Sequence, residues 1–182
     1  MDPKPNLNIL AISGSLKATS ANSRILKAIS VFAGKEAEFM IYSELDQLPH
    51  FNPDKEQGNE AVLRFKELVK NADAVVISTP EYAFGVPGTL KNALDWTVSS
   101  GEFNEKPVIA ISASPMYEGG LKAMTSLLLT LSALGTKTDE RSHLSIANIL
   151  NKMDKEGRIH DEQTEKDLRS LFNHLIEVTK EE

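Results

Sequence analysis

Apolar segments typical of strands alternate with helical patterns along the whole chain, and this alternation constrains the fold most strongly. The strand-like segments are Leu7–Ser13, Glu38–Tyr42, Ala74–Ser78, Val108–Ser112 and a weaker one within Thr136–Ser145. Apolar residues at helical spacing follow them, as at Ile25, Ala28, Ile29 and Phe32. Such alternation predicts a parallel sheet with helices on both faces. We therefore expect a three-layer α/β fold with a five-stranded parallel sheet in the order 2-1-3-4-5.

The length and composition suit one domain, which we expect to span residues 1–182. Of the 182 residues, 41% are apolar and 25% are charged, as in ordinary globular proteins. The chain has no cysteine, which excludes thiol chemistry and iron–sulfur clusters, so redox chemistry would need a bound cofactor. The net charge of −6 argues against a nucleic-acid partner. The start Met1–Asn6 lacks a signal peptide's apolar run, and Leu127–Leu134 is too short to span a bilayer, so we expect a cytoplasmic protein without a membrane partner.

Three unusual loops follow strands at one edge of the expected sheet. Open parallel sheets bind ligands outside the carboxyl ends of their strands, at the point where the strand order reverses. In the order 2-1-3-4-5 this point lies between the first and third strands, with the fourth strand beside the third. The loops to consider therefore begin at Ser13, Ser78 and Ser112.

The first loop, Ser13–Arg24, leaves a strand, opens a helix and carries many groups that bind phosphate. Its polar side chains are those of Ser15, Lys17, Thr19, Ser20, Asn22, Ser23 and Arg24. A helix N-terminus adds free backbone N–H groups and the positive end of a dipole. The loop matches neither the Gly-x-x-x-x-Gly-Lys nor the Gly-x-Gly-x-x-Gly pattern, so it indicates a single phosphate monoester. Ser20 or Asn22 could instead serve only to cap the helix.

The second and third loops could contact a planar ligand. Thr79–Gly88 holds two prolines and two glycines, which indicates a shaped and rigid loop. Tyr82 and Phe84 in this loop could lie against an apolar ring, or could pack under the loop. The third loop, Ser112–Gly120, ends in two glycines, which would let a ligand approach the backbone closely.

These motifs resemble those of the NAD(P)H-dependent FMN reductases, a flavodoxin-like family that includes quinone, azo-dye and chromate reductases. Gly14-Ser15-Leu16-Lys17, with Ser20 and Asn22, looks like the phosphate loop of that family. Pro80-Glu81-Tyr82, with Pro87–Trp96, resembles its second signature, and Leu48-Pro49, Asn52-Pro53 and Gly119–Ala123 also fit. The resemblance covers nearly the whole chain. It implies a flavodoxin-like sandwich that binds FMN and uses NADPH or NADH as co-substrate.

The resemblance also implies which residues bind the cofactor. They are Ser13, Ser15, Lys17, Ser20, Ala21, Asn22 and Ser23 in the first loop, Pro80, Glu81, Tyr82, Ala83, Phe84 and Gly85 in the second, and Ser112, Gly119 and Gly120 in the third. Lys17 replaces the usual Arg, and Lys binds phosphate as a point charge rather than through two parallel bonds. Ala83 and Gly85 stand where Asn and Ser are common, so two polar groups beside the flavin are missing.

The implied reaction has two halves at one site. A hydride passes from NADPH or NADH to FMN, and electrons then pass to a small acceptor: a quinone-like, azo, metal-ion or free-flavin compound. Because the flavin carries this chemistry, we name no catalytic residue. We also expect no metal site, since the four histidines lack ligand spacing. A non-enzymatic flavodoxin-like electron carrier and a flavin-binding regulatory module are the alternatives.

The helix after Pro87-Gly88 bears on the oligomeric state. Its predicted apolar face consists of Leu90, Ala93, Leu94 and Val98. In the family that this chain resembles, the helix lies at a subunit interface, which implies a homodimer or homotetramer. Trp96 could anchor a partner subunit there, or could pack inside its own subunit.

Overall fold

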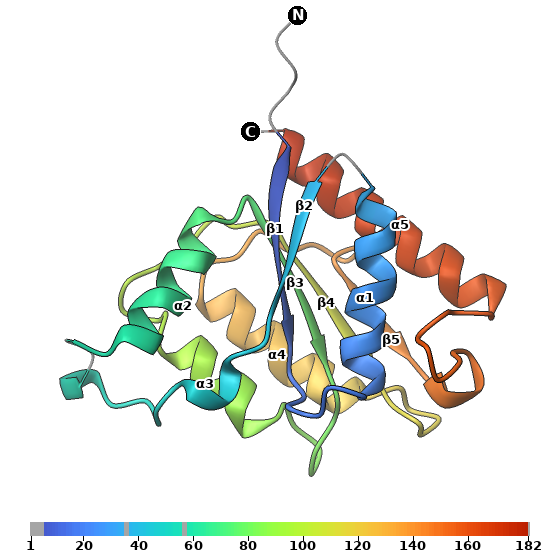
Figure 1. Cartoon of the computed structure of the whole chain (residues 1–182), viewed down its shortest axis with the longest axis horizontal. Coiled ribbons are helices and arrows are strands. Elements are labelled where there is room, and N and C mark those ends of the chain that lie inside the picture. The colour runs from blue at the N-terminus through green and yellow to red at the C-terminus, as the bar shows by residue number, and fades with distance from the viewer. Residues whose placement is uncertain (1–5, 35–36, 56–57, 182) are drawn as a thin grey trace, which may run out of the picture.

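The computed structural model describes residues 6–34, 37–55 and 58–181, and this part of the chain forms one five-stranded sheet and five α-helices (Figure 1). The strands are β1 (Leu7–Ser13), β2 (Ala37–Tyr42), β3 (Ala74–Thr79), β4 (Val108–Ala113) and β5 (His143–Ile146). The helices are α1 (Ala21–Ala33), α2 (Glu60–Asn71), α3 (Gly88–Asp95), α4 (Leu121–Ala133) and α5 (Glu162–Lys180). All neighbouring strands are parallel, and the order β2-β1-β3-β4-β5 confirms the prediction. The prediction about a signal peptide concerns Met1–Asn6, of which residues 1–5 lie outside the described residues.

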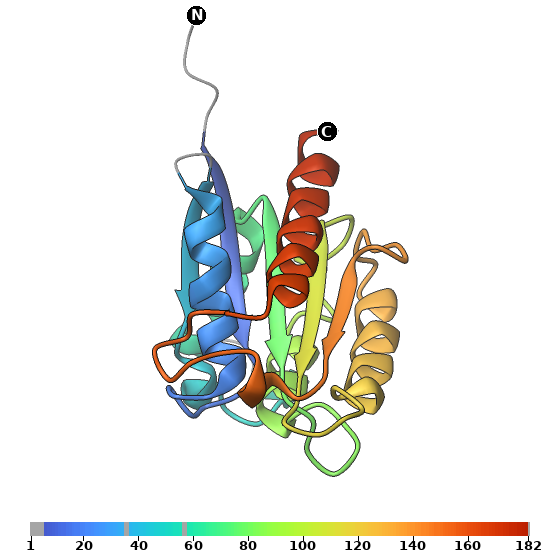
Figure 2. The same cartoon turned by 90° about the vertical axis from the view of Figure 1, so that its right-hand side faces the viewer.

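The two faces of the sheet are covered by different helices, and alternate residues of each strand supply the two cores. Leu10 and Ile12 of β1 pack in the core beneath α2, α3 and α4. Ile9 and Ala11 point to the opposite face, in the core beneath α1 and α5. Figure 2 shows α1 and α5 in front of the sheet. Every residue of β3 and β4 is buried, which explains why their sequences are continuous apolar runs rather than alternating ones.

Side-chain caps define where three of the helices begin. Ser20 caps α1, Asn59 caps α2 and Asp161 caps α5, each by accepting a hydrogen bond from a backbone N–H in the first turn. The residue types at these positions are those that favour the start of a helix. Among the described residues, no helix combines the length and the apolar character needed to cross a bilayer.

The end of α3 differs from the prediction. The helix stops at Asp95, so Val98 lies beyond it and is 61% exposed rather than part of the apolar face. Trp96 is fully buried, and its indole N–H donates to the carbonyl of Pro49 at 2.9 Å. Of the two alternatives for this tryptophan, packing inside its own subunit is therefore correct.

Candidate functional site

The three loops converge at the carboxyl ends of β1, β3 and β4, as predicted. They lie together at the lower edge of the molecule in Figures 1 and 2. The Gly14 N–H donates to the Ser78 carbonyl at 2.7 Å, so the first loop begins directly against β3. A Cβ on Gly14 would lie 2.9 Å from Thr79 Oγ1, which explains the glycine. The site therefore forms where the strand order reverses.

Serine hydroxyls of the first loop form a connected cluster at the start of α1. Ser23 Oγ lies 2.8 Å from Ser20 Oγ and 2.9 Å from Ser13 Oγ. Ser20 Oγ also accepts from the Ser23 N–H at 3.0 Å, so this residue caps the helix. Ser15 Oγ accepts from the Lys17 N–H at 3.3 Å. The capping alternative is confirmed for Ser20, and a cap of this kind leaves other N–H groups of the first turn free to bind an anion.

Asn22 is placed differently from what its expected role suggests. Its side chain is buried, and its Nδ2 donates to the Ala113 carbonyl at 3.2 Å. Its Oδ1 accepts from the Ser78 hydroxyl at 2.9 Å. The amide therefore ties the start of α1 to the ends of β3 and β4. Asn22 can still bind an anion through its backbone N–H, which lies next to that of Ala21 in the first turn of α1.

A cavity of about 280 Å³ opens beside the first loop, towards the end of β2. Its lining includes Ser13, Ser15, Ser23, Lys27 and Tyr42, together with the carboxylate of Asp46. Burial, together with the nearby Glu44 carboxylate, raises the pKa of Tyr42 to about 12, so its phenol is protonated at neutral pH. Lys17 is exposed on the loop. This end of the site thus combines hydroxyl groups, cations and a helix N-terminus, which suits a phosphate.

The second loop forms a two-residue hairpin whose aromatic side chains are exposed. Tyr82 and Gly85 exchange two backbone hydrogen bonds of 3.0 Å. Between them, Ala83 and Phe84 have φ values of 48° and 63°, in the left-handed region that non-glycine residues rarely adopt. Tyr82 is 57% exposed and Phe84 is 67% exposed, so the alternative that they pack under the loop is wrong. Pro80, half-buried, connects the hairpin to β3.

The third loop packs closely on the sheet through its two glycines. Gly119 and Gly120 have φ values of +65° and +81°. A Cβ on Gly119 would lie 3.0 Å from the Ala147 nitrogen, and one on Gly120 would lie 3.2 Å from the Cβ of Ser112. The buried Ser112 hydroxyl donates to the Gly119 carbonyl at 2.8 Å. These glycines are therefore required by the protein's own packing as well as by any ligand.

Glu81 makes a contact that the sequence did not reveal. Its Oε2 accepts from the backbone N–H groups of Lys122 and Ala123, each at 3.0 Å. The carboxylate therefore caps α4, whose own N-cap residue, Gly120, has no side chain. Because 41 residues separate Glu81 from Lys122, no local motif could have indicated this pairing.

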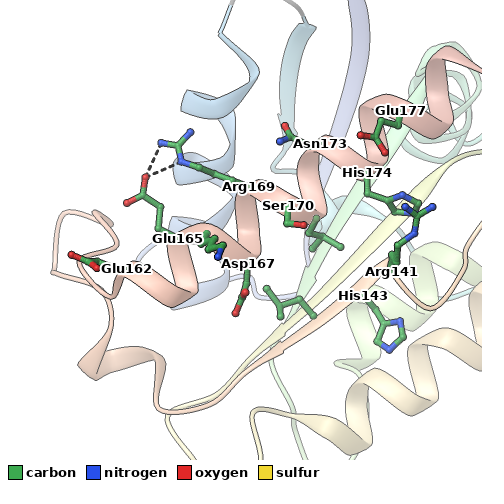
Figure 3. A pocket seen from close by; sticks show the side chains of 13 residues that line it. Arg141, His143, Glu162, Glu165, Asp167, Arg169, Ser170, Asn173, His174 and Glu177 are labelled. Carbon is green, nitrogen blue, oxygen red and sulfur yellow. Dashed lines mark hydrogen bonds and ion pairs between the residues drawn. The ribbon is translucent and has the colours of Figure 1, made fainter.

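The largest cavity described lies elsewhere, between β5 and α5, and has a volume of about 820 Å³ (Figure 3). None of the predicted cofactor residues lines it. Two of its charged side chains, Glu165 and Arg169, form an ion pair of 2.7 Å. Within the described residues, no cluster of His, Asp or Glu has the geometry of a metal site. The cavity therefore supplies no evidence for a second site of chemistry.

The inner wall of that cavity contains a buried histidine. His174 Nε2 lies 3.0 Å from Asp139 Oδ1 and 3.3 Å from the Ser142 hydroxyl. Desolvation alone would raise the pKa of Asp139, but hydrogen bonds from the Arg141 N–H and the Ser142 hydroxyl outweigh it and lower this pKa. The group ties the loop before β5 to α5, which is a structural role.

Several known proteins are similar in sequence to this chain. The model of the family described as NADPH-dependent FMN reductase matches residues 7–150. An NAD(P)H-dependent FMN reductase of Pseudomonas aeruginosa is 33% identical over 164 residues, 87% of each chain. A quinone reductase of Pseudomonas putida is 31% identical over 161 residues, 85% of each chain. An NADPH azoreductase of a Bacillus species is 36% identical over 110 residues, 59% of this chain and 61% of that one.

Solved structures show the same fold. A flavoenzyme NAD(P)H:(acceptor) oxidoreductase from Paracoccus denitrificans superposes with a TM-score of 0.82 at 29% identity, over 96% of this chain and 98% of that one. A flavodoxin, WrbA-like protein from Agrobacterium tumefaciens reaches a TM-score of 0.61 at 16% identity, over 97% and 99% of the two chains. The flavodoxin-like fold expected from the sequence is therefore confirmed.

Proposed function

The chain belongs to the NADPH-dependent FMN reductase family of oxidoreductases, and from this premise we propose that it binds FMN across the carboxyl ends of β1, β3 and β4. The phosphate would lie in the first loop and the ring against the second and third loops. The observation that carries this proposal is the start of α1, where free N–H groups, a serine cluster and Lys17 lie close together. This point lies between β1 and β3, where the strand order reverses. Residues 1–182 would act as one FMN-binding domain.

At the phosphate end, the residues that fit are those of the first loop. The backbone N–H groups of Ala21 and Asn22 begin the helix and point their dipole at an anion. The hydroxyls of Ser15 and Ser20 supply further donors, and Lys17 supplies a mobile positive charge. One phosphate monoester satisfies this set, which favours FMN over a dinucleotide.

At the ring end, the backbone contributes more than the side chains. Ala83 and Gly85 carry no side-chain polar group, so polar contacts to the ring would come from main-chain N–H groups. Those of Tyr82, Gly85 and Gly119 already donate to carbonyls of the protein, so the contacts would come from Ala83, Phe84 and Gly120. The exposed Tyr82 and Phe84 add apolar area beside it. This arrangement fits a planar group that is apolar on its faces and polar at its edge.

When bound, FMN supplies the redox chemistry by accepting a hydride from NADPH or NADH and releasing electrons to an acceptor. The side chains of this chain bind and orient, and we assign none of them a catalytic role. A quinone-like, azo, metal-ion or free-flavin compound is the proposed acceptor, in line with the names of the quinone reductase and azoreductase relatives.

The phosphate assignment is tested by comparing FMN with riboflavin, which lacks the phosphate. Lys17→Gln should weaken FMN binding about tenfold, because it removes one charge-assisted contact, and should leave riboflavin binding unchanged. Lys70→Gln, which removes an exposed lysine of α2, is the matched control and should change neither affinity. Equal affinities of the unaltered protein for FMN and riboflavin, measured by fluorescence quenching, would show that no phosphate site exists.

Family membership also suggests an assembly. We propose a homodimer or homotetramer that acts on small molecules and needs no nucleic acid or membrane partner. Because Trp96 is buried, an interface would have to use other side chains of this region. Sedimentation velocity at micromolar concentration tests the assembly, and a single species of the 20.0 kDa monomer would contradict it.

A further inference from the structure

The second loop and the start of α4 hold each other at two points. Glu81 Oε2 accepts hydrogen bonds of 3.0 Å from the N–H groups of Lys122 and Ala123. Lys122 in turn places its Nζ 3.7 Å from the centroid of the Phe84 ring, which is a cation–π distance. Lys122 therefore contacts the residue before the hairpin through its backbone and a residue of the turn through its side chain.

These contacts hold a strained turn. A two-residue hairpin with two positive φ values normally uses Asn-Gly or Gly-Gly, yet here it uses Ala83 and Phe84, at 48° and 63°. Such a conformation persists only where the surroundings fix it. Phe84 is 67% exposed, so burial contributes little, and the fixed points are the Tyr82–Gly85 hydrogen bonds and the contacts to α4.

The same contacts bring the second and third loops together. α4 has no acidic residue in its first turn, and Glu81 supplies the missing negative charge from the end of β3. A Cβ on Gly120 would lie 3.6 Å from the Cβ of Glu81, so the two loops are in van der Waals range. The carboxylate therefore sets how far the hairpin stands from Gly119–Gly120.

We propose that Glu81 and Lys122 are positioning residues, which clamp the Ala83–Phe84 turn to α4 and so fix the spacing of the two backbone segments that face the flavin ring. This inference rests on the proposed FMN site. It assigns the Glu81 side chain to the protein's own architecture rather than to a contact with the ring.

Amide hydrogen exchange measures the contact between Glu81 and α4, and flavin affinity measures its effect on the ring end of the site. In full-length protein without added flavin, Glu81→Ala should speed the amide hydrogen exchange of Lys122 and Ala123 by about tenfold or more. In the same variant, the affinities for FMN and riboflavin should fall by the same factor, about tenfold, because the ring end is disturbed and the phosphate end is not. Glu81→Gln keeps an acceptor oxygen and should restore part of both properties.

A second rescue and a matched control separate positioning from loss of stability. Ala83→Gly in the Glu81→Ala background should restore part of the flavin affinity, because glycine adopts a positive φ without strain. Asp161→Ala removes a capping carboxylate from α5 and should leave α4 exchange and flavin affinity unchanged. Unchanged exchange at Lys122 and Ala123 in Glu81→Ala would overturn the clamp, and faster exchange with unaltered flavin affinity would overturn its positioning role. If the unaltered protein bound neither flavin, the proposed function would be wrong. The exchange rates would still show whether Glu81 protects the Lys122 and Ala123 N–H groups.

Discussion

Replacing Asn22 by alanine should destabilise the protein strongly, even though the residue lies in a loop expected to bind a ligand. The side chain is 2% exposed and makes two buried hydrogen bonds, to the Ser78 hydroxyl and to the Ala113 carbonyl. Asn22→Ala leaves both partners buried without a bond, at about 1–3 kcal/mol each. We therefore expect a loss of about 3 kcal/mol from a free energy of unfolding that is typically about 5–15 kcal/mol.

Urea unfolding of the protein without flavin measures this loss. With a slope of about 2 kcal/mol per molar urea, the midpoint should fall by about 1.5 M. The double variant Asn22→Ala/Ser78→Ala should lose less than the sum of the two single variants, because it removes one orphaned hydroxyl together with its partner. Asn173→Ala, at an exposed position of α5, is the matched control and should change stability little. A loss below about 0.5 kcal/mol for Asn22→Ala would show that its two buried hydrogen bonds do not stabilise the fold as expected.

Three further perturbations test other parts of the structure by urea unfolding. Gly14→Ala should cost about 1–3 kcal/mol, since its Cβ would meet Thr79 at 2.9 Å, whereas Gly88→Ala, with open space around it, should be neutral or slightly stabilising. The raised pKa of Tyr42 means that the stability from its protonated phenol is present below pH 10.0 and lost as the pH rises towards about 12, so Tyr42→Phe should flatten that decline. The lowered pKa of Asp139 contributes stability above pH 3.8 that is lost as the pH falls below it, and Asp139→Asn should remove that acid sensitivity.

Much of the fold could be predicted because its determinants are local. The buried strands β3 and β4 are continuous apolar runs, and the periodic helices between strands fix a parallel sheet. The end of α3 could not be predicted in this way. The apolar spacing continues to Val98, but the chain leaves the helix after Asp95, and Trp96 bonds to Pro49, 47 residues earlier in the sequence.

In the site too, features that depend on neighbouring residues could be predicted, and contacts between distant residues could not. Capping was an alternative for Ser20 or Asn22, and Ser20 makes the cap, since capping depends only on neighbouring residues. Asn22 and Glu81 were assigned to the cofactor by resemblance, yet their side chains bond to groups 91 and 41 residues away. Pairings at such separation depend on how strands and helices are assembled. A single sequence therefore predicted that the three loops converge, but not how these two side chains are used.

If this chain is an FMN reductase, it should bind FMN, and NADPH or NADH should reduce the bound flavin. The most direct measurement is an anaerobic stopped-flow titration of the purified protein, supplied with FMN, with each nicotinamide in turn. The visible absorbance of the bound flavin should be bleached rapidly by at least one of the two, and restored when a quinone is added. A protein that binds no FMN, or whose bound FMN neither nicotinamide reduces, would contradict it.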